Sequence, residues 1–495
     1  MTRLGRFAEN ARFHSELVNL SISAIDGRGP GAKVVAVTDS REFRGTDSIM
    51  DDQFLFEMPV GEPAPPPSDR AHEGGIPRMR CANRKQIGFR ACALDDLLPD
   101  DHQARSVWKY VEGLDLTDLY NEIAAVEGRP GHPPADPRIL FSLWLYATLR
   151  GVGSARELDR LCVDHVAYMW ICGDVSMNYH TLSDFRTKHV DLLDRLLTES
   201  VASLLAEGLV TLDRVAQDGM KVRANAGAAS FRRKQTLEEL LAEAKQQVEA
   251  LRAELEADPG AAKDRQRAAR ERAAAEREQR IRDALNQIPM IEAAKKAADK
   301  AKARASTTDP DARTMKMADG GFRPAFNVQF ATATDSQVIT GATVTNSGGD
   351  QGQMAPMVAQ HQARYGEPPD EILVDGGFAK KDDIDAVSAP QGATTVFAPV
   401  MQSKDPNRDA HEPRADDSPP VAEWRARMAT DEAKEIYKQR AATAEWSNAQ
   451  ARNRGLHQFR VRGLRKVKAV VLWYVLAHNL MQAAALRAKA APKGT

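Results

Sequence analysis

The chain of 495 residues has only four cysteines and almost no net charge. Cys81, Cys92, Cys162 and Cys172 are spaced too widely for a CxxC zinc site. They are also too few to form a disulfide scaffold in a chain of this length. We therefore expect free thiols.

A long hydrophobic run is absent as well. No stretch of about 18 uninterrupted apolar residues occurs, which argues against a membrane-spanning helix. The nearest candidate, residues 469–486, contains His478, Asn479 and Gln482, and we interpret it as a buried or amphipathic helix. The first twenty residues carry several charges and no apolar core, so we expect no secretory signal peptide and a cytoplasmic location.

At roughly 150 residues per domain, the length predicts about three domains. Residues 1–90 have scattered glycine and proline without a sustained period, which predicts a poorly ordered N-terminal extension. A helical period over residues 91–209 predicts an all-α domain. Strand signals in residues 210–230 and 306–485, mixed with helices in the later part, predict an α/β fold with a mixed sheet. Residues 486–495 are left as a tail.

The sheet region is interrupted by residues 231–305, which are rich in alanine, glutamate, glutamine, lysine and arginine. This segment lacks aromatic residues after Phe231 and is broken near Pro259. The pattern predicts two antiparallel helices that form a coiled-coil hairpin between the first and second strands of the sheet. Before it, the run VTLDRVAQDGMKVRANA predicts short strands with a break at its glycine.

The small net charge of -1 conceals a basic C-terminal segment. Residues 440–495 contain eleven lysines or arginines and a single acid, Glu445. Such a segment is either a surface that faces phosphates or a solvated basic helix face.

Two aspartates occupy similar places in the sequence: Asp218 in VAQDGMKV and Asp375 in ILVDGGFA. Each ends an apolar run and precedes a glycine. If the two strands are neighbours, both carboxylates lie a few ångströms apart and repel each other unless a divalent cation neutralises them. Oxygen ligands favour Mg²⁺ or Mn²⁺. The alternative is that each motif is an ordinary Asp-Gly turn.

Glu445 is the candidate for a third acid. Arg452 lies seven residues further on, within about 20° of Glu445 on a helix, with Asn448 between them. One helix face then offers a carboxylate for a metal and a cation for a phosphate. A plain surface pair is the alternative.

The three acids and their surrounding sequences together resemble the DDE transposases of bacterial insertion sequences, which have an RNase H-like catalytic core. The segments that carry the resemblance include QDGMKVRANA, MADGGFRPAFNVQFATATDSQVITGATVTN, ILVDGGFA and YKQRAATAEWSNAQARNRGLHQFRVRGLRKVKAVVLWYVLAHNL. The helical stretch PRILFSLWLYATLRGVGSARELDRLC and the later NYHTLSDFR resemble the N-terminal domain that precedes this core. The resemblance covers about residues 93–485.

The resemblance implies that Asp218, Asp375 and Glu445 bind two Mg²⁺ or Mn²⁺ ions. It also implies a Tyr-Arg-Glu-Lys set around the glutamate, which maps to Tyr437, Arg440, Glu445 and, in place of the lysine, Arg452. The match departs at one point, because four residues rather than three separate Arg440 from Glu445.

On a continuous helix the extra residue places Arg440 about 140° from the glutamate face. Lys438, seven residues before Glu445, shares that face and is the expected substitute for Arg440.

The resemblance also implies that the chain binds the terminal inverted repeats of its element and target DNA as a homodimer in a synaptic complex. It is expected to catalyse metal-dependent strand cleavage and strand transfer. The alternatives are a transposase-derived DNA-binding scaffold without catalysis and a nuclease on the same fold. The expected DNA contacts are Tyr437, Lys438, Arg440, Arg452, Arg460, Arg462, Arg465, Lys466 and Lys468.

Three polar residues in YHTLSDFR leave two interpretations open. His180, Asp184 and Arg186 either touch DNA or form a network at the start of a helix that Thr181 or Ser183 caps.

Overall fold

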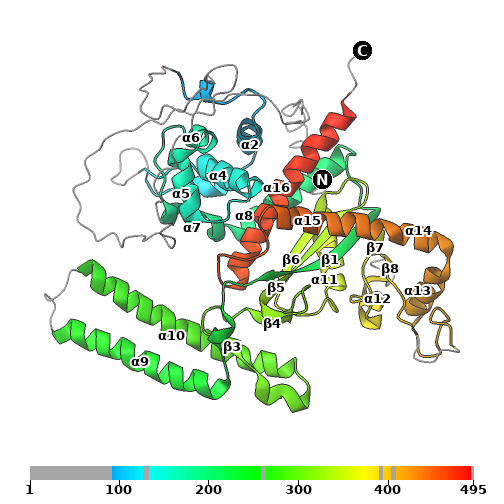
Figure 1. Cartoon of the computed structure of the whole chain (residues 1–495). Coiled ribbons are helices and arrows are strands. Elements are labelled where there is room, and N and C mark those ends of the chain that lie inside the picture. Colours follow the sequence, from blue (N-terminus) through cyan, green and yellow to red (C-terminus); the bar gives the residue numbers. More distant parts are fainter. Residues whose placement is uncertain (1–91, 126–132, 258–263, 389–393, 403–407, 492–495) are drawn as a thin grey trace, which may run out of the picture. The chain divides into compact units, whose positions relative to one another are not determined.

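The computed structural model describes residues 92–125, 133–257, 264–388, 394–402 and 408–491 (Figure 1). The predicted N-terminal extension and Cys81 lie outside these residues. The three described cysteines, Cys92, Cys162 and Cys172, are free.

The described residues before Arg214 form helices and the loops that connect them. The most apolar is α4, in which all residues except Arg138 and Leu149 are buried. The Asp136 side chain accepts a hydrogen bond from the Arg138 amide at the start of α4, and Pro137 occupies the first turn, where its missing N–H leaves no helical hydrogen bond unmade. The helices are α2 (Gln103–Glu112), α3 (Thr117–Asn121), α4 (Pro137–Leu149), α5 (Ala155–Asp164), α6 (Val166–Cys172), α7 (Tyr179–Lys188) and α8 (Val190–Ala206), preceded by a short 3-10 turn, Asp95–Leu97.

A mixed sheet follows, with strand order β6-β5-β1-β7-β8. β4 pairs with the first residues of β5, on the same edge where β6 pairs with the later residues. β1 is antiparallel to β5, whereas β7 is parallel to both β1 and β8. The fold is therefore mixed α/β, as the sequence predicts. The strands are β1 (Arg214–Arg223), β4 (Arg313–Lys316), β5 (Phe322–Ala333), β6 (Ile339–Thr345), β7 (Glu371–Leu373) and β8 (Thr395–Phe397).

The expectation of a break at the glycine of the first strand is wrong, because β1 runs through Gly219 without interruption. Asp218 consequently lies in the middle of the strand, opposite Phe330, and not at its end. A Cβ at Gly219 would overlap Asp350 Oδ1 and Gln329 Nε2. Glycine is therefore required here for a close approach of side chains, not for a turn.

Helices cover both faces of the sheet. On one face, α11 (Met354–Tyr365) packs so closely on Gly341 that a Cβ there would overlap Met357. On the other face, Ser447 of α15 (Trp446–Asn453) hydrogen bonds Thr332 of β5. The remaining helices of this region are α12 (Lys381–Ser388), α13 (Pro419–Ala429), α14 (Asp431–Arg440) and α16 (Leu464–Ala490).

α16 joins the sheet to the preceding helices. It contacts α4, α7, α8 and β6, and Trp473 packs on Phe141 with 4.6 Å between the ring centroids. By length and composition α16 could cross a membrane, but 67% of its most apolar window is buried inside the protein. Such burial is typical of the central helix of a core, which agrees with the interpretation of residues 469–486 as buried.

The start of α16 is held by two aspartates from the loop that precedes β4. Asp309 Oδ1 accepts a hydrogen bond from the Gly463 amide and Asp311 Oδ2 accepts one from the Leu464 amide. Asp309 is fully buried and its Oδ2 has no hydrogen-bond partner among the described residues. Burial raises the pKa of Asp309 to about 6.

Between β1 and β5 the chain forms a helical hairpin, α9 (Lys234–Ala257) and α10 (Asp264–Ala293), which run side by side (Figure 1). Its own apolar cluster includes Leu237, Ile281 and Ile288. The short strands β2 (Phe231–Arg232) and β3 (Ala305–Ser306) pair at its base. The hairpin cluster is separate from the two clusters that hold the sheet and its helices.

Replacing residues 245–279 by a short flexible linker should therefore leave the rest of the fold intact. The base of the hairpin and its apolar cluster remain in this variant. We expect the melting temperature of the main unfolding transition to change by less than about 2 °C, because distant independent regions contribute separately to stability. Loss of the cooperative transition in calorimetry would show that the hairpin tip supports the sheet.

The Asp309→Asn substitution tests the cost of the buried carboxyl group. Its folded pKa lies above the unfolded value of 3.8, so the wild type loses stability as the pH rises from about 4 through 6. The amide that replaces the carboxyl group stays neutral, and we expect the variant to be more stable than the wild type at pH 7.5 by up to about 2 kcal/mol. The advantage should shrink towards pH 4 in urea denaturation. Asp184→Asn, which removes an exposed carboxylate, is the control; an equal effect of both substitutions would contradict the account.

Candidate active site

The strand register brings Asp218 and Asp375 together. Ala216 of β1 pairs with Leu373 of β7 in parallel, and each aspartate follows its pairing residue by two positions. One guanidinium nitrogen, Nη2 of Arg440, lies 3.1 Å from Asp218 Oδ1 and 3.9 Å from Asp375 Oδ2. Both carboxylates therefore flank the same cation.

Asp218 is the more enclosed of the two acids. Its side chain is 20% exposed, compared with 42% for Asp375. Asn448 Nδ2 donates a hydrogen bond of 2.8 Å to Asp218 Oδ2. Burial raises the pKa of Asp218, and the nearby charge of Arg440 and the Gly219 amide partly oppose this. A buried carboxylate of this kind requires a positive partner to remain ionised at low cost.

Arg440 reaches the acids because the helix changes its pitch. Residues Ala441–Glu445 form a π-helical turn, in which hydrogen bonds join residue i to i+5 and one extra residue fits into the turn. The extra residue between Arg440 and Glu445 is accommodated in this way. The expectation that Arg440 faces away from the site, based on a continuous α-helix, is wrong.

Lys438 is not the substitute for Arg440. Its ammonium group pairs with Glu435 one turn earlier, and both side chains are exposed. Tyr437, by contrast, is half-buried and packs against the apolar cluster of β7, β8 and α11 to α14. The structure thus places Arg440, and not Lys438, at the two aspartates.

Glu445 ends the π-helical turn with an exposed side chain. The structure does not join it to Asp218 or Asp375. Among the residues that the structure describes, no group of three or more histidine, cysteine, aspartate or glutamate side chains is arranged to hold a metal ion. That Glu445 completes the metal site with Asp218 and Asp375 stays a prediction. Asn448, three residues further on and about 60° around the helix, contacts Asp218 instead.

Asn448 is a site residue that the sequence reasoning missed. It is 4% exposed, and its Oδ1 has no hydrogen-bond partner among the described residues. The only signal in the sequence is its position between Glu445 and Arg452. With Asp218 and Asp375, it adds a third oxygen donor beside the acids. All three donors are of the type that Mg²⁺ and Mn²⁺ prefer, so the residues present fit such an ion.

The expected DNA contacts beyond Arg440 lie mainly on the surface. Arg465 pairs with Asp191 at 3.0 Å and Lys468 with Asp194 at 3.6 Å, so α8 neutralises part of their charge. Apart from Lys438, which pairs with Glu435, the other basic residues of the set have no ion pair with a described residue and are exposed; they are Arg452, Arg460, Arg462 and Lys466.

The YHTLSDFR segment forms α7, with Asn178 as the cap. Its side chain accepts a hydrogen bond from the Thr181 amide, so neither Thr181 nor Ser183 is the cap. His180 and Asp184 are exposed, whereas Arg186 is 6% exposed. Arg186 therefore lies inside the protein and not on an open DNA-facing surface.

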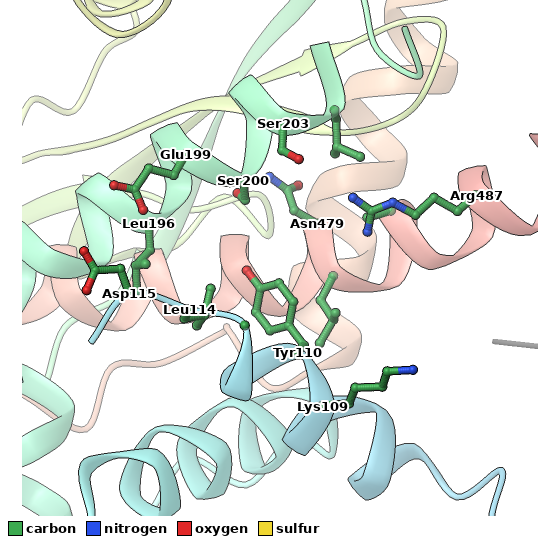
Figure 2. A pocket seen from close by; sticks show the side chains of 14 residues that line it. Lys109, Tyr110, Leu114, Asp115, Leu196, Glu199, Ser200, Ser203, Asn479 and Arg487 are labelled. Atoms are coloured by element: carbon green, nitrogen blue, oxygen red, sulfur yellow. The ribbon is translucent and has the colours of Figure 1, made fainter. Parts of the chain in front are cut away.

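A separate pocket lies between α2, α8 and α16 (Figure 2). Tyr110, Ser200, Asn479 and Arg487 are among its lining residues. None of the expected catalytic or DNA-binding residues lines it. Asn479 hydrogen bonds the backbone of Ile339, and Arg487 pairs with Glu207. Both polar side chains therefore already have partners inside the protein.

The fold and the paired acids define a mixed α/β protein with a two-carboxylate site next to an arginine. Comparison with family models gives two matches: Transposase domain (DUF772) over residues 92–188 and Transposase DDE domain over residues 402–484. The matches support a DDE transposase of the insertion-sequence type, which confirms the resemblance seen in the sequence. A search of curated proteins and a search of solved structures each returned no match.

The second match contains Arg440, Glu445 and Arg452, whereas Asp218 and Asp375 lie between the two matched ranges. The transposase domains thus indicate a transposase, and the link between the aspartates and the matched C-terminal segment comes from the contacts of Arg440 and Asn448.

Deleting Ala442, an exposed residue of the π-helical turn, tests how Arg440 reaches the site. The deletion should restore α-helical pitch and rotate Arg440 by about 100° away from Asp218. We expect a loss of folding stability on the order of 1 to 3 kcal/mol, equal to that of Arg440→Met, because both leave a half-buried carboxylate without its cation. The measurement is chemical denaturation at pH 7.

The variant that carries both changes should be no less stable than either single variant, because the deletion and Arg440→Met remove the same interaction. Ala442→Ser, which keeps the length of the turn, is the control and should resemble the wild type. Additive losses would mean that the turn does not position Arg440.

Proposed function

We propose that this transposase binds the ends of its insertion sequence and catalyses metal-dependent strand cleavage and strand transfer. The observation that carries the proposal is the shared contact of Arg440 with Asp218 and Asp375. One acid within β1 and one just after the neighbouring β7, held around one cation, form the kind of site that phosphoryl transfer needs. The strand order β6-β5-β1-β7-β8, with three antiparallel and two parallel strands, supports an RNase H-like core.

Asp218, Asp375 and Glu445 are proposed to hold two Mg²⁺ or Mn²⁺ ions. When bound, such ions activate a water or a 3′-hydroxyl and stabilise the leaving oxygen. Glu445 is exposed and pairs with no described residue, so its side chain is available to the site. Asn448 fixes the orientation of the Asp218 carboxylate through the hydrogen bond to Oδ2.

Arg440 neutralises Asp218 and Asp375 in the structure as it stands. Its planar guanidinium group also suits phosphate oxygens, which it binds through paired N–H donors. The exposed Arg452, Arg460, Arg462 and Lys466 extend this positive charge along the chain. They supply salt-sensitive contacts to the DNA backbone, with Arg465 and Lys468 able to join them on releasing the acids of α8.

The proposed partners are the terminal inverted repeats and target DNA in the cytoplasm, bound by a homodimer in a synaptic complex. A transposase-derived scaffold that binds DNA without cutting it is the competing function. The two acids around Arg440 favour the enzyme, because a scaffold has no need of two adjacent carboxylates that repel each other and cost stability.

The decisive experiment pairs cleavage with binding. The substrate is a duplex that carries the sequences flanking the reading frame of the element. Asp218→Asn, Asp375→Asn and Glu445→Gln should each lower strand cleavage with Mg²⁺ or Mn²⁺ by about a hundredfold or more, since each removes a charged metal ligand. DNA binding in a gel shift without metal should persist or strengthen, because repulsion of phosphate decreases.

Glu435→Gln is the matched control, since Glu435 is an exposed acid of α14 that pairs only with Lys438 among the described residues. It should cut like the wild type. A wild type that binds the duplex but cuts with neither metal would favour the scaffold. Normal cutting by the three variants would show that other residues hold the ions.

A further inference from the structure

Arg186 of α7 carries a charge that the structure leaves without an acid. It is 6% exposed, and its Nη1 donates a hydrogen bond of 2.6 Å to the Gly153 carbonyl oxygen. Its guanidinium group stacks over the ring of Trp144 at 4.6 Å. Arg186 Nε is buried without a hydrogen-bond partner, and no described carboxylate forms an ion pair with this arginine.

Burial lowers the pKa of Arg186 to about 10, so the side chain stays charged at neutral pH. Burying a charge without a counter-ion costs free energy that packing alone does not return. A residue in this state is suited to an anion that arrives from outside the chain.

A second arginine approaches the same place from another part of the chain. Arg460 lies in the loop between α15 and α16, where Asn225 Nδ2 donates a hydrogen bond to its carbonyl oxygen. The loop also pairs with the end of β1 through backbone hydrogen bonds of Arg223 with His457 and Phe459. These contacts hold Arg460 near the loop between α4 and α5.

Gly153 lies beside both guanidinium groups. A Cβ at Gly153 would lie 3.7 Å from Arg460 Nε and 4.0 Å from Arg186 Nη2. The missing side chain therefore leaves a space that two cations border. Arg460 also has no ion pair with any residue that the structure describes. After burial, the charge of Arg460 is a further cause that lowers the pKa of Arg186, so the two cations repel each other and are best satisfied by one shared anion.

We propose that Arg186, Arg460 and the space at Gly153 form a binding site for a backbone phosphate of DNA, here called the Gly153 cradle. Phosphate oxygens accept charge-assisted hydrogen bonds from arginine, and two guanidinium groups match one phosphodiester. DNA is favoured over a free phosphate because Arg460 is one of several exposed basic residues in this part of the chain, with Arg452, Arg462 and Lys466. Several cations in one segment suit a polyanion.

The proposal of the Gly153 cradle rests on the proposed function only because it takes DNA as the partner. It adds a contact from the helical region, since Arg186 belongs to α7 and Gly153 to the loop before α5. It also gives Arg186 a role that differs from both a surface DNA contact and a helix cap: the phosphate reaches the buried guanidinium through the space that Gly153 leaves.

The test fills the cradle without disturbing the fold. Gly153→Ala adds one methyl group at ordinary van der Waals distance from its neighbours, and the backbone of Gly153 does not adopt a positive φ. Arg460→Gln removes one cation from an exposed position, where substitution leaves folding intact. Both variants should keep the melting temperature of the wild type, whereas a substitution at buried Arg186 risks unfolding.

Binding is measured by fluorescence anisotropy with the end-bearing duplex, in EDTA and over a series of salt concentrations. We expect each variant to bind about three- to tenfold more weakly, with the slope of log K against log salt reduced by about 0.9 for the one lost phosphate contact. The double variant should bind at most about twofold more weakly than Arg460→Gln, because both changes disrupt the same contact.

The controls change the same residue types elsewhere. Gly227→Ala adds a methyl group in open space, and Arg270→Gln removes an exposed arginine from α10. Both should bind like the wild type with an unchanged salt slope.

The outcomes separate the cradle from the proposed function. If the wild type binds the duplex and the cradle variants bind equally well with the same slope, the cradle is wrong and the function stands. If the wild type does not bind the duplex, both are wrong. A third arm adds inorganic phosphate in thermal denaturation. In one outcome, phosphate stabilises the wild type but not Gly153→Ala, while both cradle variants bind DNA as the wild type does. That result would show that the site holds a free anion, and it would overturn the assignment to DNA.

Discussion

The carboxylate of Asp218 lies in the middle of β1 between Nη2 of Arg440 and Nδ2 of Asn448. A carboxylate in the interior of a sheet is costly unless charge and hydrogen bonds compensate it, and here both come from the C-terminal helices. This requirement links the strand to a segment more than two hundred residues later in the chain. The π-helical turn, the burial of Asn448 and the neighbouring Asp375 all depend on that arrangement.

Much of this arrangement could be predicted from the sequence. The apolar runs that precede Asp218 and Asp375 indicate strands, and parallel pairing of two such strands brings their acids to one place. The apolar runs of α4 and α16 likewise predict the helices that hold the core. These features depend on hydrophobic periodicity and on residue type, both of which the sequence contains.

The rest could not be predicted because it depends on packing. An Asp-Gly pair usually indicates a turn, but Gly219 leaves room for Asp350 and Gln329, which come from later in the chain. The extra residue after Arg440 could be noticed in the sequence. Only the surrounding contacts decide whether such an insertion rotates the helix or forms a π-helical turn. The orientation of Glu445 is a side-chain and local backbone property that periodicity does not determine.

The C-terminal segment therefore serves two places at once. Arg440 and Asn448 face the aspartates of the sheet, while Arg460, after the end of α15, lies beside Gly153, as does the buried Arg186 of the helical region. α16 then fixes the spacing of both places by packing on β6 and on α4, α7 and α8. The central proposal is that Asp218 and Asp375 hold a metal ion and that Arg440 leaves the two carboxylates when the ion binds. A crystal structure of crystals soaked in Mn²⁺, with anomalous diffraction, tests it most directly. The account predicts an anomalous peak that Asp218 and Asp375 both ligate, with Glu445 turned towards it and Arg440 moved off the acids. The account is contradicted if the peak lies elsewhere, or if no peak appears at saturating Mn²⁺ and Arg440 stays between the two carboxylates.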